Sequence, residues 1–293
     1  MKKKILVTGS AGFIGGELVQ RLLKEGHEVI GLDILKNSEL PIDQYVVDLR
    51  AKQILDEDLW KEIEYVFHLA AVANINFARE HPDETFAINT LGTYNMAKNC
   101  LKYKIPLLYV STCAVYGATK DIPRTELSLP EPTEIYAQTK FAAETFAKMP
   151  IQWVIPRFST VYGPTMRSAL ATHIFLTKAV NSEKITLSGD GKQRRTWIYI
   201  DDLIEATYKI YDGKIFNEII NLGANESPSV KDLARWCYQV VHGETTRIPI
   251  EYGPARPGEV DEVISIEKAK RLLHWIPQYK LKAGLKKVYK EWK

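Results

Sequence analysis

The chain has 293 residues, of which 45% are hydrophobic and 26% are charged, and its 39 Lys and Arg residues nearly balance its 36 Asp and Glu residues. This composition indicates a globular protein and excludes an intrinsically disordered chain, a coiled coil and a collagen. The net charge of +3 is spread along the sequence instead of gathered in a basic tract. We therefore expect no binding to nucleic acid, whereas a small anionic substrate is compatible with this charge.

The first apolar run, residues 5–7, predicts a strand because it is too short for a signal peptide or a membrane span. No stretch of the chain approaches 18 apolar residues, so we expect no membrane partner. The three cysteines, Cys100, Cys113 and Cys237, lie far apart without CxxC spacing. This argues against a disulfide framework and a zinc site, and it predicts a cytoplasmic protein without a metal.

Short apolar runs alternate with amphipathic segments through the first half, which is the pattern of βαβ units around a buried parallel sheet. After the first strand, Ile14, Leu18 and Leu22 recur at four-residue spacing and predict a helix that packs on the sheet. After Arg157 the chain becomes richer in Gly and Pro, which indicates a second, smaller unit. The expected strands are residues 5–7, 28–32, 45–47, 65–70, 107–111 and 153–155.

A glycine-rich turn, TGSAGFIG at residues 8–15, lies between the first strand and the first helix. In this position the glycines let the backbone approach a pyrophosphate at the positive N-terminus of the helix. The alternative is a glycine-rich turn that binds nothing.

Asp33 follows at the end of the second apolar run, where a carboxylate can accept both hydroxyls of an adenosine ribose and would repel a 2′-phosphate. This favours NAD over NADP, although the neighbouring Lys36 leaves NADP open. Asp48 and Leu49, after the third run, either add an adenine contact or simply form a turn.

Tyr136 and Lys140 have the YxxxK spacing that places a phenol and an ammonium on one helical face, where the cation favours the phenolate. Three other pairs share this spacing, so the context must decide. The segment comes after Ser111 and Thr112, which end the fifth apolar run, and doubly wound sheets place their ligands at the carboxyl ends of strands. A hydroxyl, a phenol and an ammonium can therefore converge there. The other pairs are Tyr94/Lys98, Tyr116/Lys120 and Tyr289/Lys293.

In this order, the glycine turn, Asp33, Ser111-Thr112 and Tyr136/Lys140 resemble the extended short-chain dehydrogenase/reductases, specifically the NAD-dependent nucleotide-sugar epimerase/dehydratase family. The resemblance covers nearly the whole chain. Further matching segments are HLAA at 68–71, NTLGT at 89–93, VYG at 115–117, Arg157 with YGP at 162–164, GDGKQRR at 189–195, residues 199–203, NLG at 221–223 and RPGE at 256–259.

The resemblance implies a Rossmann-like, doubly wound α/β domain that holds NAD and a smaller C-terminal α/β domain that holds a nucleoside diphosphate sugar. The first would comprise residues 1–157, with 196–222 returning to it, and the second residues 158–195 and 223–293. The resemblance also implies a homodimer that pairs two helices per subunit, here roughly 77–103 and 134–149.

The same resemblance assigns the site residues. Thr112, Tyr136 and Lys140 would be catalytic, and Arg195 and Arg256 would contact the diphosphate. Two departures concern the substrate: Thr160 replaces an Asn of many relatives, and TW at 196–197 replaces their Asp-Phe. The implied NAD contacts are Gly9, Gly12, Phe13, Ile14, Gly15, Asp33, Asp48, Leu49, Leu69, Ala70, Ala71, Ser111, Tyr136 and Lys140. The implied substrate contacts are Thr112, Tyr136, Thr160, Arg195, Arg256 and Glu259.

The residues after Thr112 bear on the reaction type. By resemblance, 4,6-dehydratases carry an Asp-Glu pair there and UDP-glucuronate decarboxylases carry a Glu, whereas this chain has Cys113-Ala114, which cannot exchange protons as a carboxyl group does. The segment looks instead like that of UDP-galactose 4-epimerases.

The resemblance then implies 4-epimerisation of a UDP-hexose, either UDP-glucose/galactose or an N-acetylated or uronic acid form. Tyr136, with its pKa lowered by Lys140 and the nicotinamide cation, would take the proton of the sugar 4-hydroxyl while hydride moves from C4 to NAD and later returns to the other face. The alternatives are an NAD(P)-dependent 4-reductase, an epimerase at another carbon, and a catalytically silent NAD-binding regulatory protein.

Overall fold

The computed structural model describes residues 2–51, 53–244, 248–255 and 260–293. Within these residues an eight-stranded sheet runs in the order β11-β7-β5-β4-β1-β2-β3, with β6 paired to β7. All of its strand pairs are parallel, as the alternating apolar runs predict. The strands are β1 Lys4–Thr8, β2 Glu28–Asp33, β3 Asp43–Val46, β4 Tyr65–His68, β5 Leu107–Tyr109, β6 Ser111–Thr112, β7 Trp153–Phe158 and β11 Glu218–Leu222.

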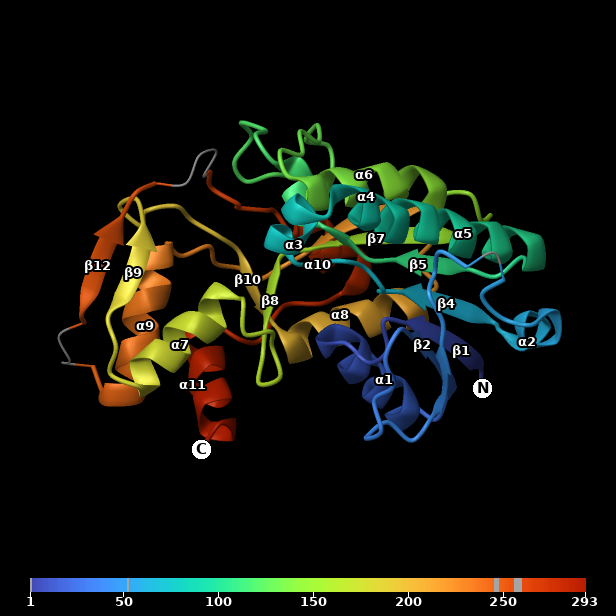
Figure 1. Ribbon diagram of the computed structural model, residues 1–293, viewed down its shortest axis with the longest axis horizontal. Helices are drawn as coiled ribbons and strands as arrows, with labels where there is room; N and C mark the ends of the chain where they lie inside the picture. The colour runs from blue at the N-terminus through green and yellow to red at the C-terminus, as the bar shows by residue number, and fades with distance from the viewer. Residues whose placement is uncertain (1, 52, 245–247, 256–259) are drawn as a thin grey trace.

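Helices cover both faces of this sheet. Successive strand residues point to opposite faces, and because the residues of both sets are apolar, each face needs a cover. Ile5 and Val7 join the apolar cluster that contains Leu18 of α1 (Phe13–Lys24), whereas Leu6 joins the cluster that contains Met96 of α5. Figure 1 shows α1 and α8 on one side of the sheet and α5 and α6 on the other. The bounds of the last three are α5 Gly92–Tyr103, α6 Ile135–Ala147 and α8 Ile200–Asp212.

The strand order changes direction at β1. From β1 the chain first adds β2 and β3 on one side, and it then returns to add β4 and the later strands on the other side. In doubly wound sheets the crevice at such a switch point, outside the carboxyl ends of the strands, is where ligands bind. The glycine turn, Asp33 and the segment after β4 all leave strands at this edge. The fold therefore gathers the expected cofactor segments in one place.

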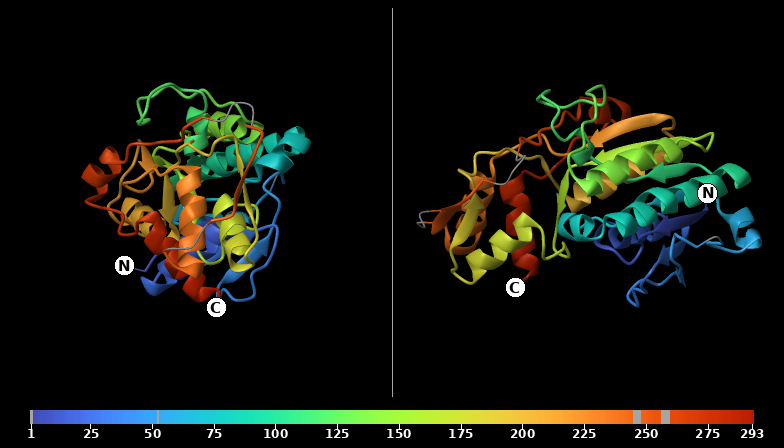
Figure 2. Two further views of the ribbon diagram at one scale, coloured as in Figure 1. Left: turned by 90° about the vertical axis from the view of Figure 1, so that its left-hand side faces the viewer. Right: turned by 45° about the horizontal axis from the view of Figure 1, so that its top comes forward.

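The second half contributes a smaller group of elements beside the sheet (Figure 1 and Figure 2). In this group β9 (Ile185–Ser188) and β12 (Ile250–Gly253) form a parallel pair, and β8 (Thr160–Tyr162) pairs with β10 (Trp197–Tyr199). Its buried side chains belong to the same apolar cluster as Ile5 and Val7, so one core joins both parts. The expected domain limits stay a proposal. Besides α8, the helices after Arg157 are α7 Ala171–Val180, α9 Val230–His242, α10 Glu267–Leu273 and α11 Leu281–Glu291.

Two expected elements have different limits. Residues 107–111 are not one strand, because Val110 separates β5 from β6 and donates its N–H to the His68 carbonyl. The segment 77–103 is not one helix, because it is interrupted at His81. Pro82 follows, and since proline has no N–H it cannot donate the hydrogen bond that would continue the preceding helix. The pieces are α3 Ile75–Glu80, α4 Pro82–Phe86, the π-helix Ala87–Leu91 and α5.

No helix in the described part of the chain is long and apolar enough to cross a membrane. The three cysteines are buried and unpaired. The remaining short helices are α2 Glu57–Glu62 and the 3₁₀ turn Cys113–Tyr116.

Candidate active site

The glycine turn packs tightly against the start of α1. Gly9 has φ +73°, and a Cβ added to it would lie 2.8 Å from the Ala70 nitrogen. A Cβ on Gly15 would overlap the carbonyl oxygen of Gly9. Gly12 is the N-cap of α1 and provides no side-chain hydrogen bond to the first turn. The first N–H groups of α1 are therefore left to other partners, and a phosphate is a suitable one.

Asp33 lies beside this turn at the end of β2. Its Oδ2 accepts a hydrogen bond of 3.0 Å from the Ala11 nitrogen, and its Oδ1 accepts one of 3.2 Å from the Leu35 nitrogen. The structure thus brings Asp33 to the glycine turn, as a ribose contact requires. Lys36 is exposed.

Asp48 is already bound by a neighbour. The guanidinium of Arg50 donates to both of its carboxylate oxygens, with Nε at 3.0 and 2.9 Å. Hydrogen bonding to Arg50 holds the pKa of Asp48 below its usual range. Leu49 is buried and its carbonyl accepts from the Asn95 amide at 2.9 Å. An adenine contact by Asp48 would therefore compete with Arg50.

The segment after β4 adjoins the glycine turn through Thr8. The Leu69 nitrogen donates to the Thr8 carbonyl at 3.2 Å, and the Ala70 nitrogen donates to the Thr8 hydroxyl at 3.1 Å. Ala70 and the following Ala71 are only partly buried. The structure therefore places these two small residues next to the turn, where the sequence predicts the cofactor.

His68 has a structural role at the same edge. Its Nδ1 lies 2.7 Å from the Thr8 hydroxyl and its Nε2 lies 3.0 Å from the Thr93 hydroxyl. Thr93 donates to the Asn89 carbonyl, so it accepts from Nε2–H, and Thr8 donates to Nδ1. Burial lowers the pKa of His68 to about 3. The ring is therefore neutral and occupied at both nitrogens.

Thr112 ends β6, and Tyr136 and Lys140 lie on the first turns of α6. The Thr112 side chain lies close enough to the Tyr136 phenol to lower its pKa. Lys140 lies on the same helix as Tyr136, one turn further on, and its Nζ lies 4.2 Å from the centroid of the Tyr109 ring. The structure thus brings the hydroxyl near the phenol and places the ammonium against Tyr109, and the catalytic role of the three groups stays a prediction.

Burial controls the protonation of this group more strongly than its internal charges do. Burial raises the pKa of Tyr136, and the Thr112 hydrogen bond and the charge of Arg167 act against the rise. Burial also lowers the pKa of Lys140 to about 7, against the opposing effect of Glu144. The expectation that Lys140 lowers the pKa of Tyr136 is therefore not met in the chain alone, because burial disfavours the charged form of both groups.

The Ser111 hydroxyl is already hydrogen-bonded within the protein. The hydroxyl donates to Glu144 Oε1 at 2.6 Å, and Glu144 also forms a buried ion pair with Arg157. Sequence reasoning missed this partner of Ser111. The signal available was Glu144 itself, an acidic residue four positions after Lys140 on the buried face of the helix.

Asn89, within the π-helix, holds α6 in place. Its Oδ1 accepts from the Val72 nitrogen at 2.7 Å and its Nδ2 donates to the Thr139 hydroxyl at 3.0 Å. Thr139 in turn donates to the Tyr136 carbonyl at 2.9 Å. Asn89 therefore links the segment after β4 to the helix turn that carries Tyr136, a role that the sequence pattern did not indicate.

The expected substrate residues are only partly described. Thr160 begins β8, and its nitrogen donates to the Thr196 carbonyl at 3.2 Å. Arg195 forms an ion pair of 2.9 Å with Glu262, so a diphosphate would compete with that carboxylate. The predictions for Arg256 and Glu259 lie outside the described residues.

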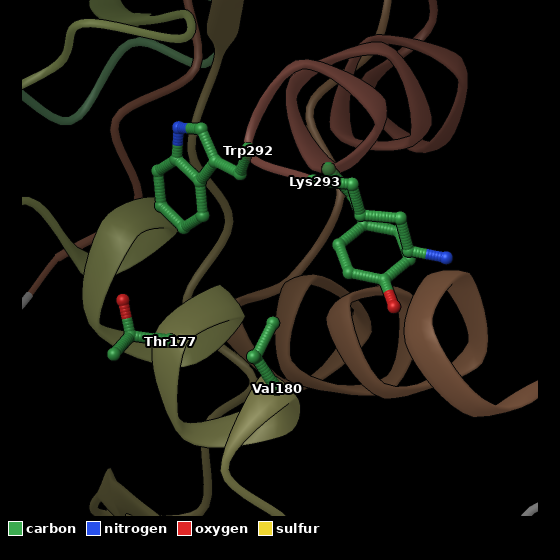
Figure 3. A pocket seen from close by; sticks show the side chains of 5 residues that line it. Thr177, Val180, Trp292 and Lys293 are labelled. Carbon is green, nitrogen blue, oxygen red and sulfur yellow. The ribbon is translucent and has the colours of Figure 1, made fainter.

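A separate small hollow of about 210 Å³ lies between α7 and α11 (Figure 3). The side chains of Trp292 and Val180 line it from opposite sides. None of its lining residues belongs to the expected site. The lining residues are Thr177, Val180, Tyr289, Trp292 and Lys293.

Comparison with known proteins agrees with this arrangement. Residues 5–223 match the NAD dependent epimerase/dehydratase family. The chain belongs to this family. The matched residues include the glycine turn, Asp33, and the Thr112/Tyr136/Lys140 group, so the family match covers the large sheet and its carboxyl edge.

The chain is similar over nearly its full length to family members that differ from one another in activity. A Methanocaldococcus jannaschii protein assigned as a UDP-glucose 4-epimerase is 33% identical, covering 97% of this chain and 96% of its own. A UDP-N-acetyl-alpha-D-glucosaminuronate decarboxylase of Bacillus cytotoxicus is 28% identical, with coverages of 98% and 97%. The solved structure of UDP-glucuronic acid 4-epimerase from Bacillus cereus, in complex with UDP-glucuronic acid and NAD, has a TM-score of 0.87 and 28% identity, with coverages of 99% and 100%.

Proposed function

We propose that the chain is an NAD-dependent nucleotide-sugar 4-epimerase that acts on a UDP-hexose in its neutral, N-acetylated or uronic acid form. The observation that carries this proposal is the placement of Thr112 beside Tyr136, close enough for the Thr112 side chain to lower the pKa of the phenol, with Lys140 one turn further along α6. This group lies at the carboxyl edge of the sheet that also holds the glycine turn. Relatives that carry UDP-sugars and NAD in their structures support the substrate and cofactor classes.

The residues present fit NAD. The absence of a Cβ at Gly9 and Gly15 lets the turn, the segment after β4 and the start of α1 pack closely, and Asp33 accepts a hydrogen bond from the turn. The backbone of Ala70 approaches Gly9 closely. When bound, NAD would accept a hydride from the sugar and return it.

The chain's own residues would handle the proton. Tyr136 accepts the proton of the sugar 4-hydroxyl and returns it, and Thr112 holds the same hydroxyl in place. Because burial raises the pKa of Tyr136, the phenol needs a partner that can exchange a proton near neutral pH. Lys140, with its pKa of about 7, is suited to that exchange.

The neighbouring side chains disfavour elimination and decarboxylation. Cys113 donates its Sγ–H to the Arg157 carbonyl at 3.2 Å, and burial raises the pKa of its thiol well above the usual value. Ala114 has no exchangeable group. Of the acidic residues in the following loop, Glu126 accepts from the Asn221 nitrogen and Glu134 pairs with Arg79. Each of these two carboxylates already has a partner.

We expect redox-neutral epimerisation at C4, tested with UDP-sugars deuterated at that carbon. Deuterium should remain on C4 of the product, and absorbance at 340 nm should show no steady growth, because the same hydride leaves and returns. Mass spectrometry and sugar analysis after incubation with a panel of UDP, GDP and dTDP sugars measure the products and their deuterium, and spectrophotometry follows the absorbance. A 4-keto-6-deoxy sugar or a pentose as product would overturn the assignment. In that case Glu126, Glu131 and Glu134 would be the first candidates for the proton chemistry.

The same incubations separate the alternative functions. Steady consumption of NADH or NADPH would identify a 4-reductase, and inversion at another carbon would identify a different epimerase. NAD binding without turnover of any sugar in the panel would indicate a regulatory protein.

We expect NAD to bind at least about tenfold more tightly than NADP, a difference of about 1.4 kcal/mol. The reason is that the Asp33 carboxylate can accept ribose hydroxyls and repels a 2′-phosphate. Calorimetry with both dinucleotides measures the ratio, and Asp33→Asn should reduce it. Lys36→Ala is the control and should leave the ratio nearly unchanged. Equal or tighter binding of NADP would contradict the role given to Asp33.

We also propose a homodimer that pairs α6 with the helical segment that ends in α5. Large apolar side chains are exposed along these elements, and covering them would be favourable. They are Phe86, Leu91, Leu101 and Phe141.

A further inference from the structure

Three charged side chains are buried together behind the Thr112/Tyr136 pair. Lys140, Glu144 and Arg157 are 2%, 3% and 2% exposed. Charged side chains are almost never buried to this degree unless they are paired. Their placement therefore requires an explanation from their contacts.

Glu144 holds this cluster together. Its Oε1 accepts from the Ser111 hydroxyl at 2.6 Å and from Arg157 Nε at 2.9 Å, and its Oε2 accepts from Arg157 Nη2 at 2.7 Å. One carboxylate thus connects β6, α6 and β7. The Arg157 guanidinium lies 4.8 Å from the centroid of the Tyr116 ring, and its Nη1 is buried without a hydrogen bond. Glu144 is consequently the one acidic partner of Arg157 among the described residues.

Lys140 forms no ion pair within the described residues. The groups that act on it come from four elements: His68 of β4, Tyr109 of β5, Glu144 of α6 itself, and, through Glu144, Arg157 of β7. Tyr136 lies one helix turn before it on the same face of α6. His68 is neutral, and both tyrosines have raised pKa values. Glu144 is therefore the one negative charge in this surrounding, and it is shared with Arg157.

We propose that Glu144 is a positioning residue for the catalytic group, which fixes Thr112 against Tyr136 and sets the charge that Lys140 experiences. This inference rests on the proposed function. Tyr136, Lys140 and Glu144 recur at four-residue spacing and share one face of α6. Ser111 precedes Thr112 on β6, so its hydrogen bond to Glu144 holds the Thr112 oxygen at a fixed place relative to the helix that carries the phenol.

The decisive test measures Lys140 directly, without substrate. NMR of protein labelled at the lysine side chains follows the titration of Lys140, with Lys140→Met identifying its signal. We expect the wild-type midpoint near pH 7. In Glu144→Gln the midpoint should fall by about one unit or more, because a nearby negative charge that favours the ammonium is lost.

Two variants separate the charge of Glu144 from its packing. Glu144→Asp keeps the charge and shortens the reach, so the Lys140 midpoint should stay close to that of the wild type while turnover falls. Asp202→Asn is the matched control, since Asp202 is also a buried carboxylate and its hydrogen bonds go to the nitrogens of Gln278 and Tyr279. It should leave the Lys140 midpoint unchanged. A folded Glu144→Gln protein with an unchanged midpoint would overturn the charge role.

Turnover tests the positioning role. Ser111→Ala removes only the hydroxyl that joins Glu144 to β6, and it keeps all three charges, so it remains informative even where Glu144→Gln does not fold. We expect its kcat for the nucleotide sugar to fall about tenfold or more with little change in KM, because misplacement affects the reacting geometry more than binding. An unchanged kcat would refute this role. If the wild-type protein turns over no nucleotide sugar, the proposed function fails, while the NMR titration still decides the role of Glu144.

Discussion

Tyr136→Phe is expected to lower the turnover of the nucleotide sugar on the order of 10²-fold or more, with folding and NAD binding retained. The substitution removes only the phenolic oxygen, which lies near the Thr112 side chain. Thr112 still accepts from the Ala114 nitrogen at 3.2 Å, so no buried group loses all of its partners. The loss should therefore appear in kcat, while the Tm and the NAD affinity stay near those of the wild type.

The chain provides its own controls for this experiment. Tyr94 and Tyr289 are each followed by a lysine four residues later, as Tyr136 is. Tyr94 packs edge-on against Phe146 and Tyr289 lines the hollow beside α11. Tyr94→Phe and Tyr289→Phe should therefore keep nearly full turnover. Normal turnover in Tyr136→Phe would move the proton transfer to another residue.

The sheet could be predicted from the sequence because its buried strands appear as short apolar runs. Ile5, Leu6 and Val7 are all buried, as a strand covered on both faces requires. The glycine turn was also predictable, since Gly9 and Gly15 are needed where the backbone turns and the helix approaches. Both follow from the properties of neighbouring residues.

The partners of the buried polar groups could not be predicted in the same way. Ser111, Glu144 and Arg157 lie on β6, α6 and β7, and they meet only because β6 pairs with β7 beneath α6. Asn89 reaches Thr139 across 50 residues of sequence. Such contacts depend on strand order and helix placement, which the periodicity of one segment does not contain.

The protonation of Tyr136 shows the same limit. Its spacing to Lys140 indicates an attraction that favours the phenolate, but spacing does not report the desolvation of either group. In the structure, burial raises the pKa of the phenol and lowers that of the amine. The charge argument omitted burial, which is the largest effect on both groups.

Gly15→Ala is expected to impair the cofactor site and Gly16→Ala to leave it intact, although the two residues are neighbours in α1. A Cβ on Gly15 would overlap the Gly9 carbonyl, whereas a Cβ on Gly16 would lie 3.6 Å from the Ser10 carbonyl, an ordinary contact. The turn cannot retreat easily, since the Gly9 nitrogen donates to the Leu32 carbonyl at 2.8 Å and its Cα faces Ala70 closely.

Overpacking of this kind costs about 1–3 kcal/mol, and we expect the Gly15→Ala protein to lose that much stability and to bind NAD at least about tenfold more weakly. Gly16→Ala should gain about 0.5–1 kcal/mol, because alanine loses less backbone entropy in a helix, and it should bind NAD as the wild type does. Thermal unfolding and calorimetry measure the two effects separately. Wild-type NAD affinity in Gly15→Ala would mean that the dinucleotide does not depend on the close approach of α1 to the turn, and the pyrophosphate would then have to bind elsewhere.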